Sequence, residues 1–353
     1  MKVVVAAGGT GGHLYPALAL VEYIKKQEPD SQFLFIGTKD RLESQVVPQL
    51  GYDYVGLVGN PLKKAHAALL FVCSIGHAKK TIKKFNPDIV VGFGGYPSAS
   101  AVQAAFGLKI KTMIHEQNSI IGLTNKILIK KVDQIVCCYQ KAYQEFPKEK
   151  TLLLGNPRAS VIVHEQPKDV YDEYHLDRQK KVVTIVMGSL GSQTVNQTMK
   201  ECMDQFKGKD YQVVYVSGKP YYESMKAYEN ENVHIVPYVN DMPSLMHITD
   251  LIVSRAGAST LAELTALGVP AILIPSPYVS ANHQEYNARE LVNNQAADMI
   301  LEKDLTGEKL ISTIDAIIND ESRLNVLKEN AQKLGKPNAL EDMYRVIVDM
   351  LGK

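Results

Sequence analysis

The segment from Val3 to His13, VVVAAGGTGGH, limits most strongly what this chain can fold into. Its consecutive β-branched valines form an apolar run that is too short for a buried helix, so they predict a central β-strand. Glycines follow around one threonine at Gly8, Gly9, Gly11 and Gly12, and from Leu14 to Ile24 apolar residues recur at helical spacing. The segment therefore predicts a strand, a glycine-rich turn and a helix whose first amide groups can bind an anion.

This glycine turn differs from two common nucleotide-binding motifs. No Gly-Lys-Ser/Thr follows it, as a P-loop requires, and the third glycine of G-x-G-x-x-G is missing. Tight packing of the helix against the strand would also explain the glycines. The turn by itself leaves both explanations open, an anionic ligand of another kind and close packing.

Strand-like apolar runs followed by helical patterns recur along the whole chain. In the first half they are Val3–Ala7, Phe33–Ile36, Ile89–Gly92, Ile110–Ile114, Gln134–Cys138 and Thr151–Leu154. In the second half they are Val182–Met187, Gln212–Ser217, Val233–Val236, Leu251–Ser254 and Ala271–Ile274. Strands that alternate with helices predict an α/β fold of doubly wound parallel sheets, with ligand groups at the carboxyl ends of the strands.

A chain of 353 residues is long for a single core, so we expect two domains. The boundary is expected at Gly155-Asn156-Pro157-Arg158, between the last apolar run of the first half and the polar stretch 165–181. The second half opens as the first does, because the run Val182–Met187 leads into the glycine-rich Gly188–Ser192. Two such units predict two Rossmann-like domains facing a cleft.

Charge is distributed unevenly between the halves. Residues 1–150 contain 19 Lys and Arg against 11 Asp and Glu, whereas the remainder contains 20 against 27. We therefore expect only the first half to meet an anionic partner. Nucleic acid is not the expected partner, because the lysines lack the interleaved aromatic residues that favour single-strand binding.

The cysteines and the apolar segments bear on the compartment. Cys73, Cys137, Cys138 and Cys202 form no C-x-x-C pair, so we expect reduced thiols in a cytosolic protein. The opening apolar run ends at Gly8, which is too early for a signal peptide. No uninterrupted apolar segment reaches the ~20 residues that span a bilayer.

The segment from Lys63 to Lys84 has two explanations. Its apolar run Leu69–Cys73 is flanked by lysines at positions 63, 64, 79, 80, 83 and 84. An amphipathic element on an anionic membrane has this pattern. A buried helix crossing a sheet has it too, and the pattern alone favours the buried helix.

In the first half, polar or glycine-rich loops follow three predicted strands, at Gly8–His13, Gly92–Ser98 and His115–Asn118. Any one of them is most simply a helix cap. Since parallel strands end at one edge of a sheet, the three loops together predict a pocket for a phosphate and a hydroxyl-bearing group.

In the second half the segment Ser254–Glu263, SRAGASTLAE, predicts another anion site at a helix N-terminus. Glu263 can close a capping box with Thr260, or it can accept hydrogen bonds from a sugar diol. Farther along, the amides of Gln284 and Asn287 suit sugar hydroxyls, although a solvent-facing loop would have the same composition.

Taken together, six segments resemble one family. They are GGTGGH at 8–13, GFGGYPS at 92–98, HEQN at 115–118, GNPR at 155–158, MGSLGS at 187–192 and SRAGASTLAE at 254–263. The family is MurG, in glycosyltransferase family 28, whose members transfer N-acetylglucosamine (GlcNAc) from UDP-GlcNAc to lipid I and so form lipid II. The resemblance implies a GT-B fold and an inverting reaction in peptidoglycan synthesis, which serves cell wall biogenesis, cell shape and cell division.

The resemblance also implies a division of the chain. Residues 1–157 with a C-terminal helix at 338–353 would bind lipid I and an anionic membrane, and residues 158–337 would bind UDP-GlcNAc. The protein would be a peripheral enzyme on the cytoplasmic face of the bacterial plasma membrane. Other cell-wall synthesis proteins are further expected partners.

Site residues follow from the same resemblance. Val239 would bind the uracil through its backbone beside Arg255, and Glu263 would bind the ribose. The remaining donor-binding residues would be Thr10, Gly11, Gly12, Asn118, Arg158, Ser189, Ala258, Ser259, Thr260, Leu261, Ala262, Gln284 and Asn287. The acceptor-binding residues would be Gly8, Gly9, Gly94, Gly95 and Tyr96.

The chain departs from the family at two places. It has Leu190 where the family has glutamine in Gly-Ser-Gln-Gly, so a side-chain amide contact is missing. Arg158 comes one residue earlier after Gly-Asn-Pro than the family arginine, which leaves its role open.

The expected chemistry needs a base for the acceptor hydroxyl and stabilisation of the departing UDP. His13 is the first candidate base, and Glu116 is the second. His13 could instead position a phosphate. The helix that starts near Ala258 would stabilise UDP. The chain contains no Asp-x-Asp, so neither an obligatory metal nor another cofactor is expected.

Other functions share these features. A UDP-GlcNAc 2-epimerase or another lipid glycosyltransferase has a similar two-domain fold. A non-catalytic module that binds a nucleotide sugar is the alternative outside enzymes. An NAD-linked oxidoreductase is disfavoured by the failed dinucleotide motif.

Overall fold

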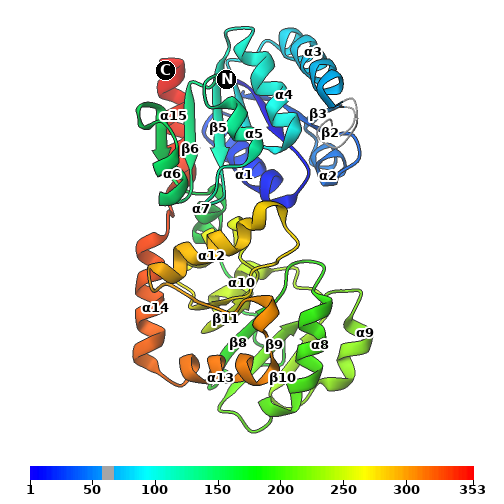
Figure 1. The fold of residues 1–353 in the computed structure, drawn as a ribbon, viewed down its shortest axis with the longest axis vertical. Coiled ribbons are helices and arrows are strands. Elements are labelled where there is room, and N and C mark those ends of the chain that lie inside the picture. Colours follow the sequence, from blue (N-terminus) through cyan, green and yellow to red (C-terminus); the bar gives the residue numbers. More distant parts are fainter. Residues whose placement is uncertain (58–66) are drawn as a thin grey trace. The chain divides into compact units, whose positions relative to one another are not determined.

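Strand β1 (Lys2–Ala7) lies in the middle of the first of two parallel sheets, where the sequence predicts a central strand. The computed structural model describes residues 1–57 and 67–353, and of Ala67 and Ala68 only the backbone. Within these residues the chain forms two units, one of Met1–Val161 with Lys336–Lys353 and one of Ile162–Gly335 (Figure 1). Each unit contains one of the sheets.

The first sheet has the strand order β3-β2-β1-β4-β5-β6-β7, and every pairing in it is parallel. Besides β1, its strands are β2 (Gln32–Thr38), β3 (Asp53–Leu57), β4 (Ile89–Gly94), β5 (Lys111–Glu116), β6 (Gln134–Cys137) and β7 (Thr151–Leu153). Strand β3 is not among the predicted strands. This edge strand is only partly buried, so it lacks the apolar run that marks the central strands.

Helices cover both faces of this sheet, as a doubly wound fold requires. They are α1 (Gly11–Gln27), α2 (Leu42–Gln49), α3 (Ala67–Phe85), α4 (Gly95–Phe106), α5 (Leu123–Leu128), α6 (Gln140–Glu145) and α15 (Ala339–Leu351), while α7 (Pro157–His164) spans the unit boundary. One face of β1 packs with α1 and α15, and the other face packs with α3 and α4. Helix α1 begins at Gly11, three residues before the predicted start.

The C-terminal helix α15, red in Figure 1, is part of the first unit. Its Leu340, Met343 and Ile347 are buried in the same cluster as α1. The rings of Tyr23 and Tyr344 meet edge to face with their centroids 5.7 Å apart. A hydrogen bond of 3.0 Å from the Leu340 N–H to the Ser160 hydroxyl links α15 to α7.

Helix α3 matches neither explanation of the lysine-flanked segment completely. Ser74, Ala78 and Ile82 are buried on one face of the helix, so part of it does pack against the unit. Leu69 and Val72 are 65% and 63% exposed on another face. The expectation of a buried helix therefore holds for one face only, and the helix is amphipathic. Lys63 and Lys64 lie outside the described residues.

The second sheet has the order β10-β9-β8-β11-β12-β13, again with parallel pairings. Its strands are β8 (Lys181–Val186), β9 (Tyr211–Val216), β10 (Val233–Val236), β11 (Leu251–Ser254), β12 (Ala271–Leu273) and β13 (Asp298–Met299). Its helices are α8 (Gln193–Cys202), α9 (Tyr222–Met225), α10 (Met242–His247), α11 (Ala258–Leu267), α12 (His283–Asn293), α13 (Gly307–Ile318) and α14 (Glu321–Leu334). The edge strand β13 is not among the predicted strands, because its two residues are too few to show a period.

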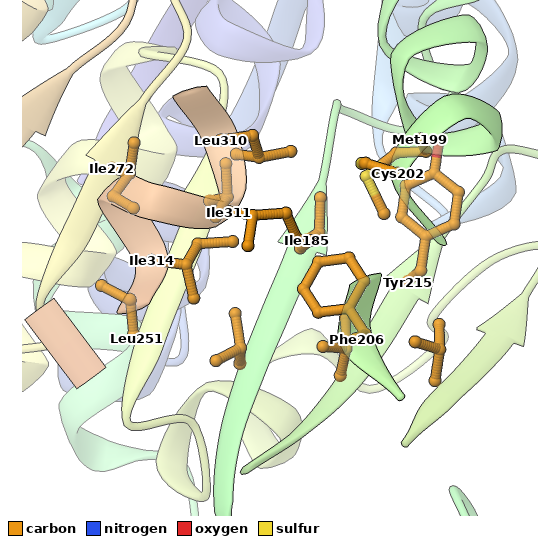
Figure 2. Packing of buried hydrophobic residues seen from close by; sticks show 14 of the residues in the cluster. Ile185, Met199, Cys202, Phe206, Tyr215, Leu251, Ile272, Leu310, Ile311 and Ile314 are labelled. Carbon is orange, nitrogen blue, oxygen red and sulfur yellow. The ribbon is translucent and has the colours of Figure 1, made fainter. Parts of the chain in front are cut away.

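Figure 2 shows the core on one face of this second sheet. Strand residues Ile185, Leu251 and Ile272 point toward Ile311 and Ile314 of α13. Each of these side chains is at most 5% exposed. The strands are therefore buried through their apolar β-branched residues, and polar groups follow at their carboxyl ends, as the sequence predicts.

All four cysteines are free thiols: Cys73, Cys137, Cys138 and Cys202. No helix within residues 1–57 and 67–353 is long and apolar enough to cross a bilayer.

Candidate active site

The first unit has a pocket of about 330 Å³ at the carboxyl ends of β1, β2 and β4. Its lining is Gly8, Gly9, Thr38, Asp40, Arg41, Gly95, Tyr96 and Thr124. Four of the five residues predicted to bind the acceptor are among them, and the fifth, Gly94, directly precedes Gly95. The structure thus brings the first two predicted loops into one pocket.

Two glycines allow these loops to touch. Gly95 has φ +76°, and a Cβ there would lie 2.4 Å from the carbonyl oxygen of Gly8. Gly94 has φ +115°, and a Cβ there would lie 2.7 Å from Cδ2 and Nε2 of His13. Both the backbone conformation and the space exclude a larger residue.

The His13 ring is oriented by the glycine turn itself. Nδ1 lies 2.8 Å from the carbonyl oxygen of Gly8 and 3.4 Å from the Thr10 hydroxyl. Because a carbonyl oxygen can only accept, Nδ1 carries the hydrogen, and in the neutral ring Nε2 carries the lone pair. This is the tautomer that a general base needs.

Gly94→Ala is expected to lower kcat for GlcNAc transfer at least 10-fold, on the order of the loss caused by a misplaced catalytic group. The new methyl group would displace the His13 ring, whereas the affinity for UDP should stay unchanged. Steady-state kinetics and calorimetric UDP binding would measure the two effects. Gly51→Ala is the matched control, because Gly51 has φ +80° but nothing within 4 Å of its Cβ position. Equal losses in both variants would contradict the role of the contact with His13.

Glu43, which the sequence pattern did not indicate, binds the glycine turn through a hydrogen bond. Its buried carboxylate accepts hydrogen bonds from the Gly9 N–H at 3.2 Å, from the Thr38 N–H at 3.0 Å and from the Thr38 hydroxyl at 2.7 Å. Thr38, Asp40 and Arg41, which line the pocket, were missed as well. A signal was available, because polar residues follow the predicted strand Phe33–Ile36 just as they follow the others.

Glu116, the second candidate base, forms hydrogen bonds within the loop that follows β5 and with the helix after it. It is buried and accepts from the N–H groups of Asn118 and Gly122 at 3.1 and 2.8 Å and from the Asn125 amide at 2.9 Å. Burial raises its pKa, and these hydrogen bonds act in the opposite direction. Neither Glu116 nor His13 lines the described pocket of the first unit, so the lining does not separate the two candidates. The geometry therefore favours a structural role and counts against Glu116 as the base.

The preceding residue, His115, is also structural. It is fully buried, and Nε2 lies 3.1 Å from the carbonyl oxygen of Gly155. Burial lowers its pKa to about 4, so the ring is neutral at physiological pH.

The second unit has a pocket of about 700 Å³ at the carboxyl ends of its strands. Six residues predicted to bind the donor line it: Ser189, Val239, Arg255, Thr260, Glu263 and Gln284. Leu190, which replaces the family glutamine, also lines it and is 73% exposed. The loop Gly188–Ser192 that follows β8 therefore forms one wall of this pocket.

Helix α11 presents its N-terminus at this pocket. Its first intrahelical hydrogen bond runs from the Leu261 N–H to the Gly257 carbonyl oxygen at 2.9 Å. The N–H groups of Ala258, Ser259 and Thr260 are therefore not used within the helix. The first turn contains no acidic residue, so nothing in it offsets the positive end of the helix dipole. These are the properties of an anion site.

The start of α11 excludes one of the two explanations of Glu263. Gly257 is the N-cap and Thr260 is the third helical residue, so Thr260 and Glu263 do not form a capping box. That explanation is wrong, and Glu263 lines the pocket instead. Leu261 is buried and its N–H is bonded, so it offers the pocket no polar donor.

The two predicted amides lie in different surroundings. The Gln284 side-chain oxygen accepts from the Ser276 N–H at 2.9 Å, which leaves its NH2 group for a ligand. Asn287 is fully buried, and its amide donates to the carbonyl oxygen of Ala256 at 3.3 Å. Asn287 thus supports the loop before α11 and does not line the pocket, which argues against direct contact with the sugar.

The guanidinium group of Arg255 contacts three other groups of the protein. It donates to the Ser192 hydroxyl at 2.9 Å and to the Ile274 carbonyl oxygen at 3.0 Å, and it pairs with Glu302 at 2.5 Å. Sequence reasoning missed Ser192 and Glu302, because no local spacing connects them to Arg255.

Among the other predicted donor residues, Ala258, Ser259 and Ala262 are on α11 but outside the pocket lining. The rest are outside this pocket as well. Thr10, Gly11, Gly12 and Asn118 belong to the first unit, and Arg158 is on α7, where its N–H donates to the Asn156 side chain at 3.0 Å. Their contact with the donor stays a prediction. No group of three or more His, Cys, Asp or Glu residues in the described part of the chain is arranged to hold a metal ion.

The chain matches two family models. The glycosyltransferase family 28 N-terminal domain matches residues 3–137, and the C-terminal domain of the same family matches residues 182–343.

Relatives match over the full length. A Bacillus cereus protein named UDP-N-acetylglucosamine–N-acetylmuramyl-(pentapeptide) pyrophosphoryl-undecaprenol N-acetylglucosamine transferase 1 is 44% identical, with 100% of both chains covered. A protein of that name without the final number, from Pediococcus pentosaceus, is 42% identical over 98% of this chain and 99% of its own.

Solved structures agree with the predicted GT-B architecture. The crystal structure of Acinetobacter baumannii MurG has a TM-score of 0.82 at 26% identity, with 99% of each chain covered. A putative UDP-N-acetylglucosamine 2-epimerase from Listeria monocytogenes has a TM-score of 0.73 at 13% identity, covering 99% of this chain and 96% of its own, which shows a shared fold alone.

Proposed function

The chain belongs to the MurG family within glycosyltransferase family 28, and from this membership we propose which of its residues carry out the reaction. The enzyme transfers GlcNAc from UDP-GlcNAc to the C4 hydroxyl of MurNAc in lipid I and so forms lipid II for peptidoglycan synthesis. The observation that carries the residue assignment is the pair of pockets, one in each unit, each bordered by a helix N-terminus.

UDP-GlcNAc binds in the pocket of the second unit. The N–H groups of Ala258, Ser259 and Thr260 face the diphosphate, where the helix dipole stabilises its charge. Glu263 accepts hydrogen bonds from the ribose diol, and Val239 binds the uracil through its backbone. The NH2 group of Gln284 is placed to donate to a sugar hydroxyl.

Lipid I binds in the pocket of the first unit, where α4 begins at Gly95 and α1 begins at Gly11. Neither helix has an acidic residue in its first turn, so both N-termini favour the acceptor diphosphate. Arg41 adds a positive charge to the lining and Asp40 a negative one, so the attraction for the diphosphate comes from the helix N-termini.

The reaction is a single displacement with inversion. Nε2 of His13 takes the proton of the acceptor hydroxyl while that oxygen attacks C1 of GlcNAc from the face opposite UDP. The bond between C1 and the UDP oxygen breaks, and the electron pair leaves with UDP. The N-terminus of α11 stabilises the negative charge that develops on the leaving group.

The test is transfer of radiolabel from UDP-GlcNAc to a short-chain lipid I analogue, with and without EDTA. We expect full transfer in EDTA, because positive helix N-termini and not a metal ion stabilise the diphosphate. Activity that collapses on chelation and returns only with a divalent ion would contradict this. Epimerised UDP-GlcNAc formed without acceptor would identify an epimerase instead.

We also propose that α3 binds the cytoplasmic face of an anionic membrane. The exposed Leu69 and Val72 lie on the same helix as the exposed lysines at 79, 80, 83 and 84. Leu123 of α5 and Phe106 of α4, which packs against α3 and α5, add exposed apolar side chains. Apolar side chains bordered by lysines suit a surface of acidic lipid headgroups.

Reversing the charge of Lys79, Lys80, Lys83 and Lys84 to Glu is expected to weaken binding to anionic phospholipid vesicles at least 100-fold, since each lysine contributes about 1 kcal/mol. Cosedimentation with vesicles would measure it. The control reverses four exposed lysines of the second unit, Lys303, Lys309, Lys328 and Lys333, for the same change in net charge. Undiminished binding of the α3 variant would contradict the membrane role.

A further inference from the structure

Glu302 is a buried carboxylate that the reaction as described does not use. It begins the short 3-10 helix Glu302–Asp304 and pairs with Arg255 at 2.5 Å. The two side chains are 5% and 12% exposed, so both charges are largely removed from water. Little solvent screens the attraction between two charges this buried.

Through Arg255 the carboxylate is connected to two walls of the donor pocket. The guanidinium donates to the Ser192 hydroxyl at 2.9 Å and to the Ile274 carbonyl oxygen at 3.0 Å. Ser192 ends the loop Gly188–Ser192 and caps α8, where its hydroxyl also accepts from the Val195 N–H. Ile274 precedes the segment that contributes Ser276 and Tyr278 to the lining.

We propose that Glu302 is a positioning residue for the nucleotide, which it does not touch. Its Oε2 contacts Nη1 of Arg255 as an ion pair without forming a hydrogen bond. This attraction keeps the guanidinium where Arg255 holds the loop after β8 and the segment after β12 at fixed positions around the pocket. Without the carboxylate, the buried cation lacks its counterion and no longer holds these two segments in place. This inference rests on the proposed binding of UDP-GlcNAc in the second unit.

The competing explanation is that the pair only stabilises the fold. Replacing one partner of a buried pair destabilises a protein in either case, so stability alone does not separate the two. UDP affinity in the folded protein does, because a purely structural pair leaves the affinity of the folded pocket unchanged.

The experiment uses the full-length chain and its Glu302→Gln variant, with UDP as the calorimetric probe. In the variant we expect the Kd for UDP and the KM for UDP-GlcNAc to be about 10-fold higher, because the groups that bind the nucleotide are displaced. The KM for the lipid I analogue should be unchanged. Glu302→Asp, which keeps the charge but shortens its reach, should lie between wild type and Glu302→Gln. Glu321→Gln is the matched control, since it breaks the exposed pair with Lys181 in the same unit.

A double variant, Arg255→Met with Glu302→Met, serves if Glu302→Gln does not fold. Removing both charges should restore the Tm, because no buried ion is left unpaired. UDP binding should stay weak, because Ser192 and Ile274 have lost their donor. Wild-type affinity for UDP in the double variant, or in folded Glu302→Gln, would overturn the positioning role. Wild-type protein that binds UDP but transfers no GlcNAc would contradict the proposed reaction alone.

Discussion

Replacing His13 by alanine is expected to lower kcat for GlcNAc transfer by roughly 100- to 10,000-fold, the usual contribution of a general base. The ring is oriented for this task, since Nδ1–H donates to the Gly8 carbonyl oxygen at 2.8 Å and the lone pair of the neutral ring is on Nε2. KM for UDP-GlcNAc should change little, because the donor pocket lies in the second unit. Single-turnover transfer to a lipid I analogue would measure the chemical step directly.

His247→Ala is the matched control for this prediction. Nδ1 of His247 also lies 2.8 Å from a backbone carbonyl oxygen, that of Pro243, and the residue is on α10 outside the lining of the donor pocket. Its loss should leave kcat unchanged. Near-normal turnover in His13→Ala would exclude His13 as the base and would leave it the alternative role of positioning a phosphate.

Glu263→Ala is expected to raise KM for UDP-GlcNAc about 100-fold and to leave KM for lipid I unchanged. A carboxylate that accepts from both hydroxyls of a ribose makes two charge-assisted hydrogen bonds, each contributing about 1.5–3 kcal/mol, and part of this is lost to solvation. Initial rates with each substrate varied in turn would separate the two KM values. Glu201→Ala, an exposed glutamate of α8 that is absent from the pocket lining, is the control.

A donor analogue makes this test specific for the ribose. Wild-type enzyme should discriminate against 2′-deoxyuridine diphosphate GlcNAc, and Glu263→Ala should treat it like the natural donor, since the lost hydrogen bond is the same. Equal effects of the substitution on both substrates, or discrimination that persists in the variant, would rule out the ribose role.

The apolar periodicity of the chain predicted most of the fold. Each run in the centre of a sheet, such as Val3–Ala7 or Leu251–Ser254, is buried on both faces by helices. Consecutive residues of such a strand are therefore apolar, and the run can be recognised in the sequence. The strands that were missed, β3 and β13, are edge strands with partly exposed or very few residues. A strand that is buried on one side only has too weak an apolar pattern to be predicted from the sequence.

The candidate site was predicted where its residues follow a strand directly. Gly8, Gly95 and Glu263 belong to such segments, and all three line pockets. Where the structure departs from the pattern that the sequence suggests, the cause lies beyond local spacing. Thr260 and Glu263 have capping-box spacing, but α11 starts at Ala258, so the hydroxyl is inside the helix. Asn287 follows a loop of suitable composition, yet its side chain is buried.

The sequence by itself determined the all-parallel α/β architecture, the glycine turns and the polar loops at the strand ends, because each depends on neighbours within a few residues. Only the tertiary structure decided which buried charges support those loops. Glu43 reaches Gly9 across 34 positions, and Arg255 reaches Ser192 across 63. Such pairs form where strands distant in sequence become neighbours in a sheet, and hydrogen bonds act over about 3 Å whatever the separation along the chain.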